Sequence, residues 1–166
     1  MDILIERCAG LDVHKKTVVA CLIVPDQSGE WHKEIRTWGT MTGDLLALSD
    51  WLREAEVTHV AMESTGVYWK PVFNVLEAEF EVLLVNAKRI KHVPGHKTDV
   101  KDAQWIAQWL QHGLLKTSFI PPAPQRAGRD LIQYRIQPIQ ERTREVNRIQ
   151  KVLEERTSSW ERWLPM

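Results

Sequence analysis

The sequence lacks any long hydrophobic run. None of its stretches approaches the ~20 consecutive apolar residues that cross a membrane, and residues 1–10 lack the apolar core of a signal peptide. We therefore expect a cytoplasmic protein that has no membrane partner. Cysteine is also scarce, because only Cys8 and Cys21 occur, in apolar stretches without CxxC spacing. This pattern indicates two reduced thiols in the core.

A net charge of either sign is also absent, yet the two halves of the chain differ strongly. Residues 1–85 hold 7 Lys and Arg against 14 Asp and Glu, whereas residues 86–166 hold 15 against 8. An acidic half followed by a basic half suits a carboxylate metal site beside a cationic surface for phosphates. Two solvated faces of opposite charge would give the same counts, so charge alone leaves both interpretations open.

Apolar patterning predicts alternating strands and helices in the first two thirds of the chain. Short runs at 8–13, 17–24, 30–38, 57–62 and 81–85 are typical of strands. Helical spacing covers 42–54, 68–79 and 99–111, and Thr42 and Thr98 stand where N-caps are expected. Two short strands separated by a short helix favour a parallel sheet, so the fold class is α/β.

The last third of the chain has a different character. Prolines within 121–124 mark a domain boundary. The pattern of residues 125–156 predicts a long polar helix with a thin apolar stripe. Such a helix needs a partner helix, in a dimer or in another part of the protein, and Pro138 is expected to kink or split it. We therefore expect a domain over 5–120, a linker helix with coiled-coil character over 121–156 and an atypical tail over 157–166.

Four acidic residues stand at chemically suggestive positions. Asp12 and Glu63 end two predicted buried strands, where ligand sites of open α/β sheets lie. Asp99 and Asp102 are three residues apart, which puts them on one face of a predicted helix start. Converging carboxylates repel one another unless a cation lies between them, and hard oxygen ligands select magnesium or manganese. The alternative is that each acid is only a turn, cap or solvated helix residue.

Basic residues flank these acids. A nucleic-acid surface is expected from five of them, with solvated lysines as the alternative: Lys15, Lys88, Arg89, Lys97 and Lys101. His14 follows Asp12 and is interpreted as a surface histidine. His92 and His96 flank Pro94-Gly95, which disfavours the regular helix that a zinc pair at this spacing would use.

Three ordered motifs resemble one known family. Gly10-Leu11-Asp12-Val13-His14-Lys15 is similar to the opening of the DEDD insertion-sequence transposases and the related Piv-type DNA invertases. Two further blocks, 62–69 (MESTGVYW) and 85–103 (VNAK to KTDVKDA), are equally typical. The basic stretch 142–151 also resembles the linker to the second domain of that family.

The resemblance implies an N-terminal domain with a ribonuclease H-like (RuvC-like) fold, a mixed sheet with flanking helices followed by a long linker helix. It implies that Asp12, Glu63, Asp99 and Asp102 are magnesium ligands of an enzyme that cuts and rejoins DNA, with manganese as the alternative ion. It also implies a structured guide RNA as a partner and a C-terminal domain carrying a serine nucleophile, while the thin apolar stripe of the helix favours a homo-oligomer through 125–156. That serine domain is absent from this sequence, so we expect a truncated, incomplete recombinase.

Two other functions remain open at this stage. A truncated transposase could act as a non-catalytic DNA-binding, RNA-binding or dimerisation module. A nuclease that resolves DNA junctions by hydrolysis would need only the four acids.

Overall fold

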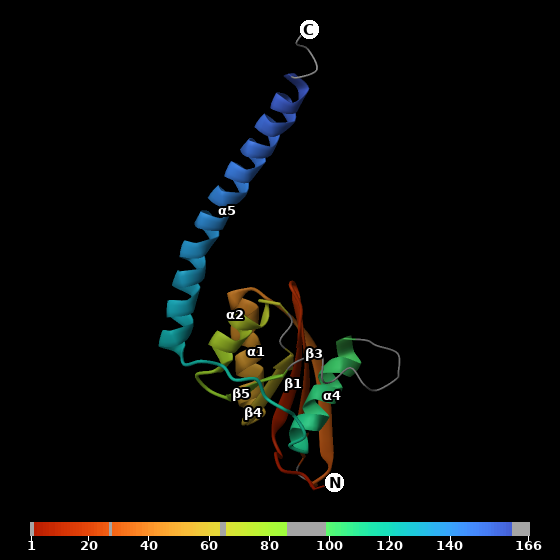
Figure 1. The fold of residues 1–166 in the computed structure, drawn as a ribbon. Coiled ribbons are helices and arrows are strands. Elements are labelled where there is room, and N and C mark those ends of the chain that lie inside the picture. The colour runs from red at the N-terminus through yellow and green to blue at the C-terminus, as the bar shows by residue number, and fades with distance from the viewer. Residues whose placement is uncertain (1, 27, 64–65, 86–98, 161–166) are drawn as a thin grey trace. The chain divides into compact units, whose positions relative to one another are not determined.

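A five-stranded mixed sheet forms the centre of the first part of the chain (Figure 1). The computed structural model describes residues 2–26, 28–63, 66–85 and 99–160, without the side chains of residues 99 and 157–160. The chain separates into two compact units, Met1–Phe119 and Ile120–Met166. The strands are β1 (Cys8–Val13), β2 (Thr17–Pro25), β3 (Trp31–Gly39), β4 (His59–Glu63) and β5 (Glu81–Val85), and the helices are α1 (Thr42–Glu54), α2 (Trp69–Leu76), α4 (Asp99–Gln111) and α5 (Ala123–Trp160).

The strand order is β3-β2-β1-β4-β5. The first three strands form an antiparallel meander, whereas β4 pairs in parallel with both β1 and β5. A parallel crossover needs a covering helix, which α1 and α2 supply between β3 and β5. This is the mixed sheet of a ribonuclease H-like, RuvC-like domain, so the predicted fold class is confirmed.

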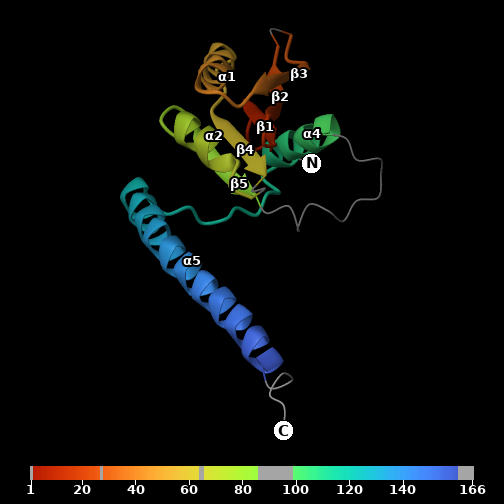
Figure 2. The same cartoon turned by 90° about the horizontal axis from the view of Figure 1, so that it is seen from above.

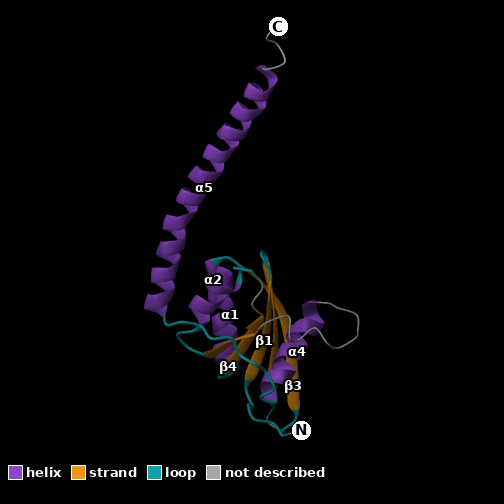
Figure 3. Ribbon diagram, viewed as in Figure 1, coloured by secondary structure: helices purple, strands orange, loops and turns teal. Residues whose placement is uncertain are grey.

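Helices cover the sheet on both faces. Figure 2 shows α1 and α2 on one side of the strands and α4 on the other, and Figure 3 shows the strands between the two groups of helices. Because side chains alternate along a strand, a strand that is covered on both faces is buried throughout. All six residues of the central strand β1 are buried, including the carboxylate residue Asp12.

Helix α4 packs unusually close to β1. A Cβ atom built on Gly10 would lie 2.3 Å from the backbone nitrogen of Ala107 and 2.4 Å from the carbonyl oxygen of Ala103. Only glycine leaves room for this contact. The small residues Ala103 and Ala107 belong to the same core cluster as Cys8 of β1 and Ala61 of β4.

Two sequence predictions about helix ends need correction or completion. Thr42 is the first residue of α1 rather than its cap, because Met41 occupies the N-cap position and makes no side-chain cap hydrogen bond. Thr98 lies outside the described residues. Gly113 closes α4, with a positive φ of 66° that suits glycine and a hydrogen bond from its N–H to the carbonyl of Leu110.

Helix α5 runs without interruption through Pro138, so the expected split does not occur. A proline removes one backbone hydrogen bond, and a helix of 38 residues retains enough others to remain continuous. Most of its described side chains are exposed. Among the described residues, no helix is long and apolar enough to cross a membrane.

The close contact at Gly10 makes a direct prediction. Replacing Gly10 by Ala should force α4 away from β1 and lower the free energy of unfolding by about 1–3 kcal/mol. Thermal unfolding followed by circular dichroism measures this as a fall of the melting temperature. Gly43→Ala in α1 is the control, because its added Cβ meets nothing within 4 Å, and it should not lower the melting temperature. Equal melting temperatures for Gly10→Ala and the unmodified chain would contradict the packing.

Candidate active site

Asp12 and Glu63 end neighbouring parallel strands. The pairing of β1 with β4 runs from Cys8 opposite His59 to Leu11 opposite Met62. One further step along both strands brings Asp12 beside Glu63. Paired residues of adjacent strands point to the same face and lie roughly 5 Å apart between backbones. The register therefore brings these two carboxylate residues together at one end of the sheet.

The start of α4 lies over the same place. Cys8 contacts the far part of the helix, because its Sγ lies 3.6 Å from the carbonyl oxygen of Ala107, and Gly10 faces the segment from Ala103 to Ala107. Each two-residue step along a strand advances ~6.6 Å, which equals about four helical residues. Asp12 is the next residue on that face, so it lies opposite the first turn of α4, which holds Asp102.

Asp12 is almost fully enclosed. Only 4% of its surface is exposed, and its Oδ2 lies 3.0 Å from Nε2 of His14. The side chain of His14 is 42% exposed, so this residue is a partner of the buried acid, and its interpretation as a surface histidine was incomplete. The two-residue spacing of Asp12 and His14 at the end of a strand was the available signal, since such residues share a face.

The remaining predicted residues divide into two groups. Lys15 and Lys101 are exposed, and the turn that carries Lys15 is tied to the end of β3, because the Thr40 hydroxyl donates a hydrogen bond of 3.1 Å to the Lys15 carbonyl. The others lie outside what the structure describes: Lys88, Arg89, His92, His96, Lys97 and the side chain of Asp99.

The chemistry of these residues fits a divalent metal. Asp12, Glu63 and Asp102 offer only carboxylate oxygens, the ligands that magnesium prefers. A carboxylate as buried as that of Asp12 also needs a cation or hydrogen-bond donors around it. Within the described part of the chain, no three His, Cys, Asp or Glu side chains already surround one point. The backbone therefore brings the strand ends and the helix start near one another, but the described side chains do not yet surround a metal position.

The two cysteines do not belong to this site. Burial raises the pKa of Cys8 to about 12 and that of Cys21 to about 11. Both are free thiols in the core, as the sequence predicts. Neither is a nucleophile at neutral pH, because the thiolate is the reactive form.

A family model described as transposase, that of the IS110-type DEDD transposases, matches residues 9–157. The chain belongs to this transposase family. No curated protein matches the sequence. Membership makes this transposase domain an enzyme that acts on phosphodiester bonds of DNA, and DEDD and RuvC-like nucleases generally use divalent metal ions.

Solved structures resemble the transposase domain at low sequence identity. Thermus thermophilus RuvC is 13% identical, with a TM-score of 0.48, and the match covers 68% of this chain and 99% of that one. Fowlpox virus resolvase, solved with Holliday junction DNA, is 10% identical with a TM-score of 0.46, covering 66% and 99%. Because these scores are low, the fold assignment depends on the strand order and directions described above.

The burial of both thiols predicts how they react. At pH 8 the native transposase domain should resist modification by a disulfide reagent such as Ellman's, because both pKa values lie well above that pH. Guanidinium-unfolded protein, as the control, should release two equivalents of coloured thiolate per chain. Rapid reaction of either cysteine in the native state would contradict the buried positions.

Proposed function

We propose that Asp12, Glu63, Asp99 and Asp102 bind magnesium and that the transposase domain cleaves and transfers DNA strands at that site, with manganese able to replace magnesium. The observation that carries the proposal is the packing next to these acids: Leu11 of β1 pairs with Met62 of β4, and Gly10 lies against Ala103 and Ala107 of α4. The first family motif holds Asp12, at the end of β1, and the second holds Glu63, at the end of β4. The third holds Asp99 and Asp102, in the first turn of α4.

The residues of the chain would act in distinct ways. Asp12 and Glu63 would bind the metal from the ends of two sheet strands, while Asp99 and Asp102 would bind it from the first turn of α4. His14 would orient the Asp12 carboxylate through its hydrogen bond. When bound, divalent ions activate the attacking oxygen and stabilise the leaving oxygen of a phosphodiester.

DNA is the substrate that the surrounding charge supports. Lys15 and Lys101 are exposed near the strand ends and the helix start, where they would neutralise phosphates. Lys88, Arg89 and Lys97 belong to the basic stretch that precedes α4 in sequence, and we propose the same role for them. The family resemblance and the basic second half support a structured guide RNA as a further partner.

Removing one acid tests the metal site. Asp12→Asn and Glu63→Gln should each abolish magnesium-dependent cleavage of branched or element-end DNA, because a neutral amide is a poor ligand. Both should also lose the rise in melting temperature that manganese or magnesium gives the unmodified chain. Glu54→Gln, at an exposed end of α1, is the matched control and should behave like the unmodified protein.

Two results would separate the alternatives. Cleavage that survives Asp12→Asn would contradict the proposed ligand set. Cleavage of junctions without strand joining would favour a junction-resolving nuclease, and salt-sensitive binding without cleavage would favour a DNA-binding or RNA-binding module.

We also propose that residues 121–156 form a dimerisation helix separate from the catalytic domain at 5–120. Four exposed apolar residues of α5 are spaced seven apart: Ile132, Ile139, Val146 and Leu153. A strict seven-residue repeat is typical of a left-handed coiled coil. A second copy of the same helix offers the same stripe, which supports a homo-oligomer.

A charge placed on this stripe tests the dimer. Ile139→Asp should shift the protein from dimer to monomer at micromolar concentration in sedimentation equilibrium, because it buries a carboxylate in the seam. Gln137→Asp makes the same charge change off the stripe and should leave the dimer intact. A monomeric unmodified protein, or equal effects of the two variants, would contradict the proposal.

A further inference from the structure

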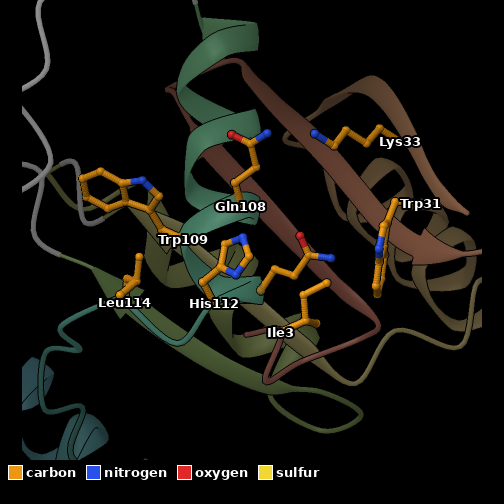
Figure 4. Close-up of a pocket in the computed structure, with 8 residues that line it drawn as sticks. Ile3, Trp31, Lys33, Gln108, Trp109, His112 and Leu114 are labelled. Carbon is orange, nitrogen blue, oxygen red and sulfur yellow. The ribbon is translucent and has the colours of Figure 1, made fainter. Parts of the chain in front are cut away.

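A pocket lies at the far end of α4 from the proposed metal site. Its volume is about 480 Å³, within the range of small-ligand pockets. Figure 4 shows it between the last turns of α4 and the first residues of β3. Eight residues line it: Ile3, Trp31, Lys33, Gln108, Trp109, Gln111, His112 and Leu114. The residues of α4 that line the pocket follow Asp102 by six to nine positions, or about 9–14 Å along the helix, so this pocket is distinct from the carboxylate cluster.

Gln111, in the pocket wall, has a side-chain amide that is almost fully buried. Only 6% of this residue is exposed, and its Nε2 is enclosed without a hydrogen-bond partner among the described residues. A buried amide nitrogen without an acceptor is costly in the folded state. The terminal amide of glutamine rotates over a broad, roughly two-fold torsion, so Gln111 can turn either its donor or its acceptor toward a ligand.

Aromatic rings supply flat apolar surfaces on both sides of these polar groups. Trp31 of β3 and Trp109 of α4 stand at opposite ends of the pocket in Figure 4. Trp109 is stacked on Trp105, one helical turn earlier, with ring centroids 6.4 Å apart and planes inclined by 22°. Two parallel indoles along one helix form a platform on which a further flat ring can stack.

The polar lining is suited to the edge of a nucleobase. Gln108 and Gln111 offer amide donors and acceptors. Nδ1 of His112 donates a 3.1 Å hydrogen bond to the backbone carbonyl of Asp2, which leaves Nε2 as the ring atom that can act on a ligand. Lys33, whose side chain extends toward Gln108 in Figure 4, brings a positive charge that a phosphate would neutralise.

From this combination we infer that the pocket binds one unpaired nucleotide of a DNA or RNA strand: the base stacks on an indole, its edge bonds to the Gln108 and Gln111 amides, and its phosphate contacts Lys33. Stacking on an indole and hydrogen bonding to the glutamine amides require a base that has left the duplex. In a duplex the faces of a base are stacked and its Watson–Crick edge is paired. The inference rests on the proposed function only in that a transposase handles nucleic acid. It involves none of the four proposed metal ligands.

Binding of short single strands tests the pocket. Labelled hexamers of deoxynucleotides and of ribonucleotides are titrated by fluorescence anisotropy in EDTA against full chains carrying Asp12→Asn, so that the carboxylate site contributes neither metal binding nor cleavage. Because the base stacks on one indole, at least one of Trp109→Ala and Trp31→Ala should raise the dissociation constant about tenfold for the strand that the pocket accepts. The deoxy and ribo arms tell which nucleic acid supplies the nucleotide. Phe119→Ala removes an exposed aromatic ring outside the pocket and should leave the dissociation constant unchanged.

Gln111→Met separates a binding role from a structural one. Because the Gln111 amide nitrogen lacks a partner in the free protein, a nearly isosteric thioether should raise the melting temperature while weakening hexamer binding. A purely structural glutamine would lower the melting temperature and leave binding unchanged.

Photo-crosslinking shows where on the chain the hexamer binds. Hexamers that contain 5-iodouracil should crosslink under ultraviolet light to the peptide holding Trp31 or Trp109. Unchanged affinity of the tryptophan variants and of Gln111→Met in both arms, or crosslinks only to other segments, would overturn the inference. Because EDTA and Asp12→Asn remove the metal site from the hexamer assay, its failure would leave the metal-site proposal standing, so the two proposals fail separately.

Discussion

The contact between Gly10 and the backbone of α4 is the constraint on which the rest of the site depends. Without a side chain at Gly10, the helix lies directly on the central strand, against the backbone of Ala103 and Ala107. Because the helix runs against β1 in a fixed alignment, this single contact determines which of its residues face Asp12. The first turn follows Ala103 next along the strand, and we propose that its Asp102 faces Asp12.

The second constraint is the parallel register of β1 and β4. Pairing of Leu11 with Met62 carries Asp12 to Glu63 across adjacent strands. A shift by one residue would turn Glu63 to the opposite face of the sheet, where α1 and α2 pack. Buried apolar residues on both faces of these strands disfavour such a shift, so the apolar core also aligns the acids.

Much of this arrangement could be predicted from the sequence. The bounds of β1, β5, α1 and α4 agree with the apolar patterns, because each is a strongly periodic or uniformly apolar segment. Asp12 and Glu63 were predicted at strand ends because each directly follows such a run. The fold class followed from the alternation of elements together with the three family motifs.

Other features were missed or misjudged from the sequence, some for local reasons and one because it joins distant segments. Thr42 was expected to be a cap, but the backbone turns one residue earlier, at Met41. Pro138 was expected to kink or split α5, and it does not split it, because the many other backbone hydrogen bonds of this long helix remain. The pocket around Gln111 became visible only in the folded chain, because α4, β3 and the N-terminal segment meet there. The bond between His14 and Asp12 had a local signal, their two-residue spacing, that was not used.

The proposed function depends most on four acids surrounding divalent ions at the end of β1. The most direct measurement is a crystal structure of the manganese-soaked protein, with manganese located by anomalous scattering. The proposed metal site predicts anomalous peaks coordinated by Asp12 and Glu63 together with Asp102 or Asp99. Manganese bound elsewhere, or a well-ordered site in which Glu63 and the first turn of α4 remain beyond ligand distance of Asp12, would contradict it.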